Sequence, residues 1–375
     1  MDKERLCELV NAARNNPPHF GSTSDHPLVR ELEGEAELAM FKDAMHYYVY
    51  GYGRMTHVEL GGWLVRRAAV VGAAQAVADL ERYTSSAAIP YRLVMATAGV
   101  TIDEPIELDG RMTVYPFAMV AQTSWAQNVA AKYSEFHPNY QPSAALIQQR
   151  DFPRRIIKIG DFAEFEDGLF TELDDVRLCI TSIGPSAPVF LGSWVDPPEW
   201  MPTSGSAANI RNPFQLEGLP PEPSKAVTKA ELVPLHRCWL ALSEKEKRHL
   251  RVPLQRLNTA MRREVAVDKA IDLGIAIDAL FLAEREADRG ELTLLLRLRA
   301  SRFLGHDAAS RKELARFFAL LYRARSSAVH SGTVSEQIDG IPMPSLLERG
   351  FGLTAAAIRI IIDAGEPDWH SLVFS

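Results

Sequence analysis

The hydrophobic and polar positions of residues 1–196 follow first a helical and then a strand-like spacing. An alanine-rich run of good helix formers over 58–83 predicts helix. From Tyr91 onward, short β-branched runs bounded by turn residues predict strands, and the pair Asp109-Gly110 between two such runs is typical of a β-hairpin. The run over 187–195 predicts a further strand. We therefore expect an α+β N-terminal domain with a small antiparallel sheet.

Residues 197–227 have the composition of a linker. Seven prolines and a Ser/Gly patch fall within or beside this stretch, and such a composition interrupts both helices and strands. Beyond it, residues 228–375 show helical spacing with almost no strand pattern. The chain is thus expected to have an α+β domain over 1–196, a Pro/Ser-rich linker over 197–227 and an all-α helical bundle over 228–375.

Four helices of the expected bundle can be bounded from the sequence. The first covers 256–283, and its second half is apolar around its whole circumference except for two aspartates, so it is expected to be buried. The second covers 291–304. The third begins at Ser310, which forms an S-x-x-E capping pattern, and the fourth begins at Thr354.

The third helix carries an arginine where its period demands a core residue. Its apolar stripe comprises Leu314, Phe317, Phe318, Leu321 and Tyr322, and the next positions of the stripe are Arg325 and Val329. A buried guanidinium must be paired or must face a cleft. Asp278, a carboxylate on the apolar first helix, is a candidate partner. A structural ion pair between Arg325 and Asp278 is the alternative interpretation.

A histidine follows this arginine near the expected end of the same helix. His330 precedes Ser331-Gly332, where the helix dipole favours a protonated imidazole. Ser326 lies four residues before His330 and could hydrogen-bond its ring. A helix-capping or surface histidine is the alternative for His330.

The run ALLYRARSSAVHSG over 319–332 resembles the R-x4-6-H signature of HEPN-superfamily domains, with Arg325 and His330 in the two motif positions. The preceding IDLGIAIDALFLAE and LLLRLRASRFLG are similar, in that order, to the first two core helices of the ApeA-like HEPN group. The resemblance implies a homodimer, formed through the C-terminal bundle, that cleaves RNA without a metal or a cofactor. It implies His330 as general acid or base and Arg325 as phosphate clamp, with Asp278 and Ser326 in support.

The charge is unevenly distributed along the chain. The net charge of -7 argues against a protein that coats nucleic acid by bulk positive charge. However, residues 1–220 carry 18 basic and 28 acidic side chains, whereas 221–375 carry 23 and 20. Within 245–263 there are seven basic residues and one acid. Such a run suits phosphate contacts, although a solvated helix face is the simpler interpretation.

The candidate RNA contacts in and beside this run are weak ones. They comprise Lys245, Lys247, Arg248, Arg251 and, on the second helix, Arg299. Arg299 lies among apolar neighbours, so a structural role is the stronger interpretation for it.

The remaining sequence features point to a cytoplasmic protein. Cys7, Cys179 and Cys238 form no C-x-x-C pair, which predicts neither disulfides nor a zinc site. No apolar run reaches the length that spans a bilayer, and the N-terminus lacks a signal peptide's apolar region.

The sequence therefore favours an endoribonuclease of the HEPN class, typical of prokaryotic anti-phage and abortive-infection systems. Its RNA target, whether tRNA, mRNA or rRNA, is left open. The N-terminal domain is expected to sense a trigger protein or ligand. The alternative is a non-catalytic HEPN module that dimerises and binds RNA or protein.

Overall fold

The structure is a computed structural model that describes residues 1–18, 25–48, 51–120, 123–134, 141–158, 168–184, 186–202, 224–282 and 292–374. The chain forms two compact units, each assembled from separate stretches of sequence. The first unit contains 1–94, 148–169 and 193–211, and the second contains 95–147, 170–192 and 212–375. The division predicted from the sequence, with a linker over 197–227, stays a prediction. The stretches of each unit are separated in the sequence because strands that are distant along the chain pair within one sheet.

The first unit has helices packed with a small sheet. Its helices are α1 (Lys3–Ala12), α2 (Pro27–Gly34), α3 (His57–Val71) and α4 (Ala73–Ser85), with 3-10 turns η1 (Ala13–Asn15) and η2 (Ala36–Phe41). Strands β1 (Ala44–Tyr48), β2 (Gly51–Arg54) and β8 (Arg155–Lys158) form a sheet in the order β2-β1-β8, with β1 antiparallel to both neighbours. The helix predicted over 58–83 is interrupted at Gly72, whose φ of 88° separates α3 from α4.

A five-stranded sheet contains residues of both units. Its strands are β3 (Ala88–Ala98), β5 (Ile106–Glu107), β6 (Met112–Pro116), β7 (Ala144–Pro153) and β9 (Val189–Asp196), in the order β5-β6-β7-β3-β9. The hairpin predicted at Asp109-Gly110 is confirmed, because β5 and β6 pair antiparallel and the Asp109 carboxylate accepts the backbone N–H groups of Arg111 and Met112.

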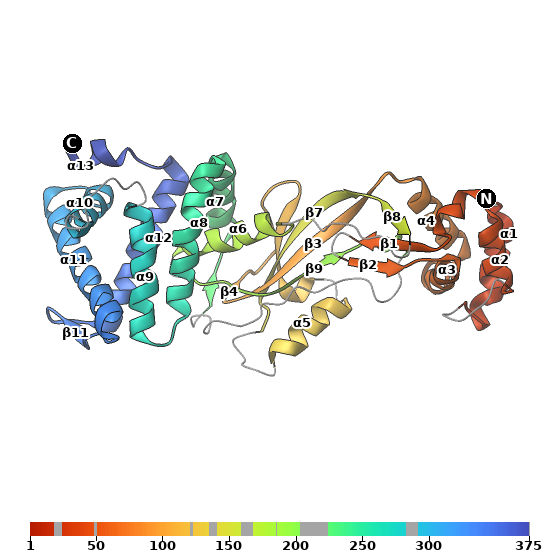
Figure 1. The fold of residues 1–375 in the computed structure, drawn as a ribbon, viewed down its shortest axis with the longest axis horizontal. Helices are drawn as coiled ribbons and strands as arrows, with labels where there is room; N and C mark the ends of the chain where they lie inside the picture. The colour runs from red at the N-terminus through yellow and green to blue at the C-terminus, as the bar shows by residue number, and fades with distance from the viewer. Residues whose placement is uncertain are drawn as a thin grey trace. The chain divides into compact units, whose positions relative to one another are not determined.

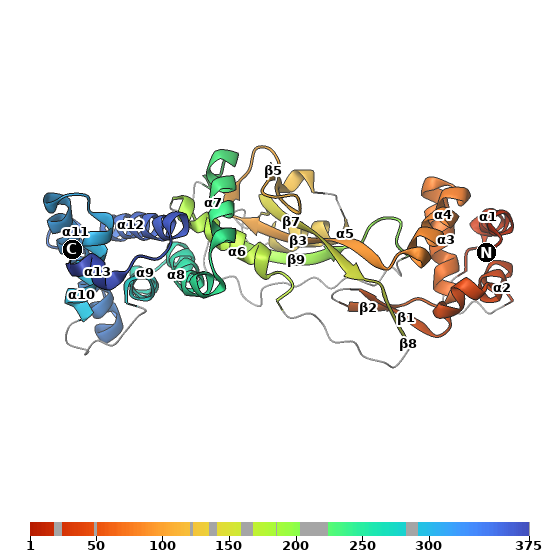
Figure 2. The same ribbon diagram turned by 90° about the horizontal axis from the view of Figure 1, so that it is seen from above.

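The C-terminal part of the second unit is helical, as predicted (Figures 1 and 2). Its helices are α7 (Lys229–Ala241), α8 (Glu244–Arg262), α9 (Ala266–Phe281), α10 (Leu292–Leu304), α11 (Ala308–Ser331), α12 (Met343–Ala364) and α13 (Trp369–Phe374). The same unit contains α5 (Ser124–Ser134), α6 (Thr171–Ile180), η3 (Phe117–Met119) and η5 (Thr181–Ile183). α9 packs against α8, α11 and α12, which explains why its sequence is apolar on nearly every side. The expected fold class, α+β followed by an all-helical region, is therefore confirmed.

Three predicted helix boundaries were wrong. The helix expected over 256–283 breaks at Arg263, which is extended and turns back so that its guanidinium pairs with Asp272 at 2.9 Å. α11 begins at Ala308, and its N-cap is Asp307, whose carboxylate accepts the Ser310 N–H, so Ser310 lies inside the first turn. Thr354 does not begin a helix, because it lies inside α12. Its hydroxyl donates to the Gly350 carbonyl one turn earlier and does not cap a helix.

A small hairpin interrupts the helical region between α11 and α12. Strands β11 (Gln337–Ile338) and β12 (Ile341–Pro342) pair antiparallel around Asp339 and Gly340, whose φ angles of 50° and 76° are both left-handed. Two left-handed residues in a two-residue loop form a type I′ turn, for which Asp-Gly is a preferred pair. The Asp339-Gly340 pair is the same sequence signal as Asp109-Gly110, but it lies between two segments with helical spacing and was not predicted to form a hairpin.

The proline-rich stretch between the expected domains lies largely outside the described residues, which omit 203–223. Its end is structured, because β10 (Lys225–Ala226) pairs parallel with β4 (Val100–Thr101). Within the described residues, no helix combines the length and apolar character needed to cross a bilayer.

Candidate active site

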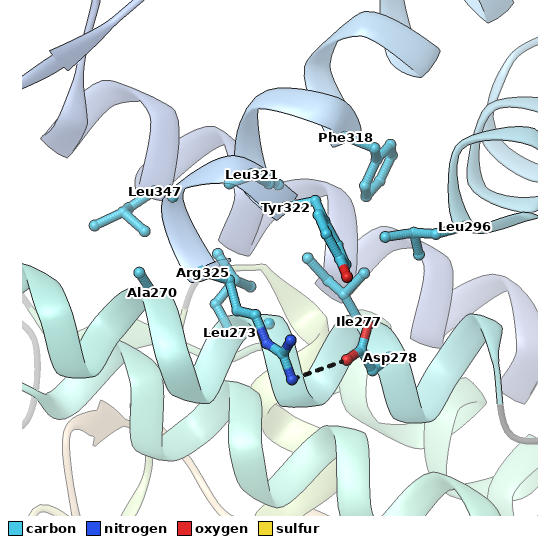
Figure 3. Close-up of a pocket in the computed structure, with 12 residues that line it drawn as sticks. Ala270, Leu273, Ile277, Asp278, Leu296, Phe318, Leu321, Tyr322, Arg325 and Leu347 are labelled. Atoms are coloured by element: carbon cyan, nitrogen blue, oxygen red, sulfur yellow. Dashed lines mark ion pairs between the residues drawn. The ribbon is translucent and has the colours of Figure 1, made fainter. Parts of the chain in front are cut away.

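Arg325 projects from α11 toward a carboxylate on α9 (Figure 3). Because α11 runs without a break from Ala308 to Ser331, the apolar stripe that begins at Leu314 carries Arg325 onto the same face. Its Nη2 lies 3.4 Å from Oδ2 of Asp278, and the two side chains are 29% and 20% exposed. The structure thus brings together the arginine and the aspartate that the sequence singled out.

The ion pair leaves part of the guanidinium unsatisfied. Nε of Arg325 is buried and has no hydrogen-bond partner among the described residues. A guanidinium carries five N–H donors, and buried donors in folded proteins are nearly always satisfied. Arg325 therefore has bonding capacity beyond its contact with Asp278.

Arg325 and Asp278 line a narrow pocket in the helical bundle. The hollow measures about 340 Å³, part of it open to solvent, and its enclosed space is about the size of one water molecule. The Tyr322 hydroxyl points toward the same end of the pocket as Asp278 (Figure 3). The other walls are mainly apolar and come from Ala270, Leu273, Ile277, Leu296, Phe318, Leu321 and Leu347. A ligand larger than water would not be enclosed by the pocket, and it could contact Arg325 only through the exposed 29% of this side chain.

Gly274 makes room for the stem of Arg325, and the sequence analysis missed it. A Cβ at Gly274 would lie 2.3 Å from Cγ and 3.0 Å from Cβ of Arg325. No side chain larger than hydrogen fits there unless the arginine moves. A glycine within an apolar helix, four residues before Asp278, is the signal that could have identified this close approach.

His330 lies in the last turn of α11 and is exposed to solvent. The helix ends at Gly332, which has a left-handed φ of 67°, as the Ser-Gly signal predicted. Five residues along an α-helix correspond to a rotation of about 140° and a rise of about 7.5 Å. Arg325 and His330 of one chain therefore point to different sides of α11. The two motif residues are not brought together within a single chain.

Ser326 does not hold the His330 ring. Both residues are described, and no hydrogen bond joins them. The hydrogen bonds at this helix end instead involve Ser327, whose hydroxyl donates to the Thr333 carbonyl, and Ser331, which donates to the Ser327 carbonyl. The predicted contact between Ser326 and His330 is therefore wrong.

Three basic residues at the start of α8 have partners within the chain. Arg251 makes two hydrogen bonds, of 2.7 and 2.8 Å, to the buried carboxylate of Asp175 on α6. These bonds raise the pKa of Arg251, although burial opposes them. Lys247 pairs with Glu244, and Arg248 donates to the Glu244 carbonyl. Because its guanidinium already has a bidentate partner, we expect that Arg251 does not contact RNA.

Substitution of Asp175 by alanine is expected to lower the free energy of unfolding by about 2 kcal/mol, because it leaves a partly buried guanidinium without its partner. Arg251→Ala is expected to have a similar effect and to leave RNA affinity unchanged. Urea denaturation followed by circular dichroism measures the first quantity. Lys245→Ala, which removes an exposed charge from the same helix, is the control. A loss of RNA affinity with unchanged stability in Arg251→Ala would contradict this assignment.

Arg299 is a structural residue of the bundle. It is 8% exposed, its Nη1 donates to the Phe281 carbonyl at 2.8 Å, and its guanidinium lies 5.6 Å from the centre of the Trp369 ring. The carbonyl belongs to the last turn of α9, where helix carbonyls lack partners within the helix. Arg299 therefore closes the end of α9 and does not extend a phosphate-binding track.

Comparisons with known proteins identify no relative: no protein-family profile, no curated protein and no solved structure matches this chain. Among the described residues, no group of three or more His, Cys, Asp or Glu side chains lies close enough to hold a metal ion.

Proposed function

We propose that this protein is an endoribonuclease of the HEPN class that works as a homodimer without a metal cofactor. The observation that carries the proposal is the pair Arg325 and His330 on one continuous helix. The arginine lines a pocket and pairs with Asp278, and the histidine is exposed about 1.4 turns further on. This pattern fits the R-x4-H motif that the sequence resembles.

The chemistry requires one group that moves protons and one fixed cation. His330 in its neutral form takes the proton of a ribose 2′-hydroxyl, and the 2′-oxygen then attacks the adjacent phosphorus. Arg325 stabilises the charge that develops on the phosphorane oxygens. The P–O5′ bond breaks as His330, now protonated, gives its proton to the leaving 5′-oxygen. The products are a 2′,3′-cyclic phosphate and a 5′-hydroxyl.

The rotation between Arg325 and His330 is the reason for proposing a dimer. Since the two side chains of one protomer diverge by about 140°, a site that uses both is most simply completed by the arginine of one protomer and the histidine of another. Asp278 is then a positioning residue, because it contacts Arg325 and not the RNA. The supporting role of Ser326 is not retained.

The biological setting is part of the same proposal. We place the protein in the cytoplasm of a prokaryote, as an anti-phage or abortive-infection effector that acts on tRNA, mRNA or rRNA. Cys7, Cys179 and Cys238 are free thiols, which suits a reducing compartment. The N-terminal region would sense the trigger.

Cleavage of total RNA by the purified full-length protein in EDTA tests the function. We expect products with 2′,3′-cyclic phosphate ends, and a loss of at least about 100-fold in rate for Arg325→Ala and for His330→Ala. Arg237→Ala and His306→Ala remove an exposed arginine and an exposed histidine elsewhere in the same unit and are expected to cleave normally. Unchanged cleavage in both motif variants would contradict the site assignment.

A non-catalytic module is the second candidate. It is favoured by the existing ion pair between Arg325 and Asp278, which can serve the bundle without any substrate. RNA binding without cleavage, retained in His330→Ala, would support this alternative.

A further inference from the structure

A row of basic side chains runs along the exposed face of α11 and ends at His330. Arg316, Arg323 and His330 recur every seven residues, which rotates successive positions by only about 20° around an α-helix. Lys312 lies four residues before Arg316, about 40° away on the same face. All four residues are exposed. At about 1.5 Å per residue the row is about 27 Å long, which is far longer than a single phosphate group.

The middle of this basic row holds one carboxylate. Asp339, at the tip of the β11–β12 hairpin, accepts from Nη2 of Arg323 at 3.1 Å and lies 3.7 Å from Nη2 of Arg316. Two guanidinium groups that stand two helical turns apart thus converge on the two oxygens of one anion. The type I′ turn at Asp339-Gly340 fixes the carboxylate in this position.

The contacts of Asp339 are of a kind that an incoming anion can replace. The side chains of Arg316, Arg323 and Asp339 are 74%, 57% and 37% exposed, and exposed ion pairs of this type contribute little to stability. By contrast, the carboxylate that holds Arg251 is 6% exposed and bidentate. Arg316 and Arg323 on α11 are therefore displaceable cations, whereas Arg251 on α8 is not.

We propose that the row Lys312, Arg316, Arg323 and His330 binds the phosphate backbone of a single RNA strand, and that Asp339 occupies a phosphate position until RNA displaces it. This rests on the proposed function in one respect, since it has the row lead the strand to a catalytic His330. Guanidinium groups bind phosphate oxygens through paired N–H donors, and such contacts are independent of sequence. The Asp339 carboxylate then competes with the RNA phosphates for Arg316 and Arg323.

Binding of a single-stranded RNA oligonucleotide to the full-length His330→Ala protein tests the proposal without cleavage. In this background, Arg316→Ala/Arg323→Ala is expected to weaken binding about 10-fold or more. It should also reduce the slope of log affinity against log salt by about 1.4, because each phosphate contact to a single strand contributes about 0.7. Asp339→Asn is expected to tighten binding several-fold. Fluorescence anisotropy at several salt concentrations measures all three effects.

The control is Arg30→Ala/Arg237→Ala, which removes the same charge from exposed positions outside the row. The proposal is overturned if Arg316→Ala/Arg323→Ala binds RNA no more weakly than this control, or if Asp339→Asn does not gain affinity. It is also overturned if polyglutamate binds more tightly than RNA and if Arg316→Ala/Arg323→Ala weakens the binding of both polymers equally. The exposed face of α11 would then suit an acidic protein.

The result is separable from that of the nuclease assay. Cleavage that depends on Arg325 and His330, with RNA affinity unaffected by Arg316→Ala/Arg323→Ala, would sustain the proposed function and overturn this inference. RNA binding along the row without any cleavage would do the reverse.

Discussion

A mixture of Arg325→Ala and His330→Ala protein is expected to cleave RNA, although each variant alone has lost at least about 100-fold in rate. The two side chains leave α11 about 140° apart, so a composite site takes its arginine from one protomer and its histidine from the other. In a dimer that contains one of each variant, one such site is intact and the other lacks both groups. Random pairing makes half of the dimers mixed, so about a quarter of the wild-type rate should return.

The measurement is co-expression of the two variants with different affinity tags, followed by a cleavage assay in EDTA. The isolated mixed dimer should cleave at about half of the wild-type rate, because one of its two sites is intact. The controls are the homodimers of each variant, prepared by co-expression of that variant with both tags. If the mixed dimer is as inactive as its parents, the arginine and the histidine do not act across a subunit interface. If the protein is a monomer that cleaves RNA, the dimeric site is wrong as well.

Gly274→Ala is expected to disturb Arg325 from a neighbouring helix, with no change in either motif residue. The added Cβ would lie 2.3 Å from Cγ of Arg325, so the arginine stem or α9 must move. Overpacking of this kind destabilises a protein by about 1–3 kcal/mol. We also expect RNA cleavage to fall at least about 10-fold, because a displaced guanidinium no longer meets the phosphate.

A second substitution separates this clash from a general effect on the helix. In Gly274→Ala/Arg325→Ala the 2.3 Å contact with Cγ is absent and only the 3.0 Å contact with the Cβ of residue 325 is left, so Gly274→Ala should destabilise Arg325→Ala clearly less than it destabilises the wild type. Gly352→Ala is the matched control, because that helix glycine has nothing within 4 Å of an added Cβ and its replacement should stabilise by about 0.4–1 kcal/mol. Equal destabilisation by Gly274→Ala with and without Arg325 would disprove the steric explanation. Chemical denaturation of the wild type and these four variants measures the free energies of unfolding to be compared.

The helical period explains how much of the candidate site could be predicted from the sequence. Leu314 and Phe318 define a core face, and extending their spacing places Arg325 on that face without any knowledge of the fold. The partner could be proposed because a carboxylate such as Asp278 rarely lies on an apolar helix without a reason. The pocket could not be predicted, since its shape depends on how α9, α10, α11 and α12 pack.

Long-range pairing accounts for what the sequence missed. Arg251 finds Asp175, which is 76 residues away and belongs to a segment that was expected in the other domain. Asp339 meets Arg316 and Arg323 only because a hairpin turns back onto α11. Local spacing contains no information about such contacts. The sequence therefore does not distinguish Arg251 on α8, whose carboxylate partner is buried, from Arg316 and Arg323 on α11, whose shared carboxylate partner is exposed.

The interleaved make-up of the second unit bears on how this protein can be divided or recombined. The helical bundle is tied to residues 170–192, both through Arg251 and Asp175 and through Asn258, whose amide donates to the Thr181 hydroxyl and the Pro188 carbonyl. A gene fusion or truncation placed in the proline-rich stretch would separate these partners. The bundle therefore cannot be exchanged between proteins by a single junction in the proline-rich stretch. Substitutions in the bundle at these contacts require matching substitutions in residues 170–192.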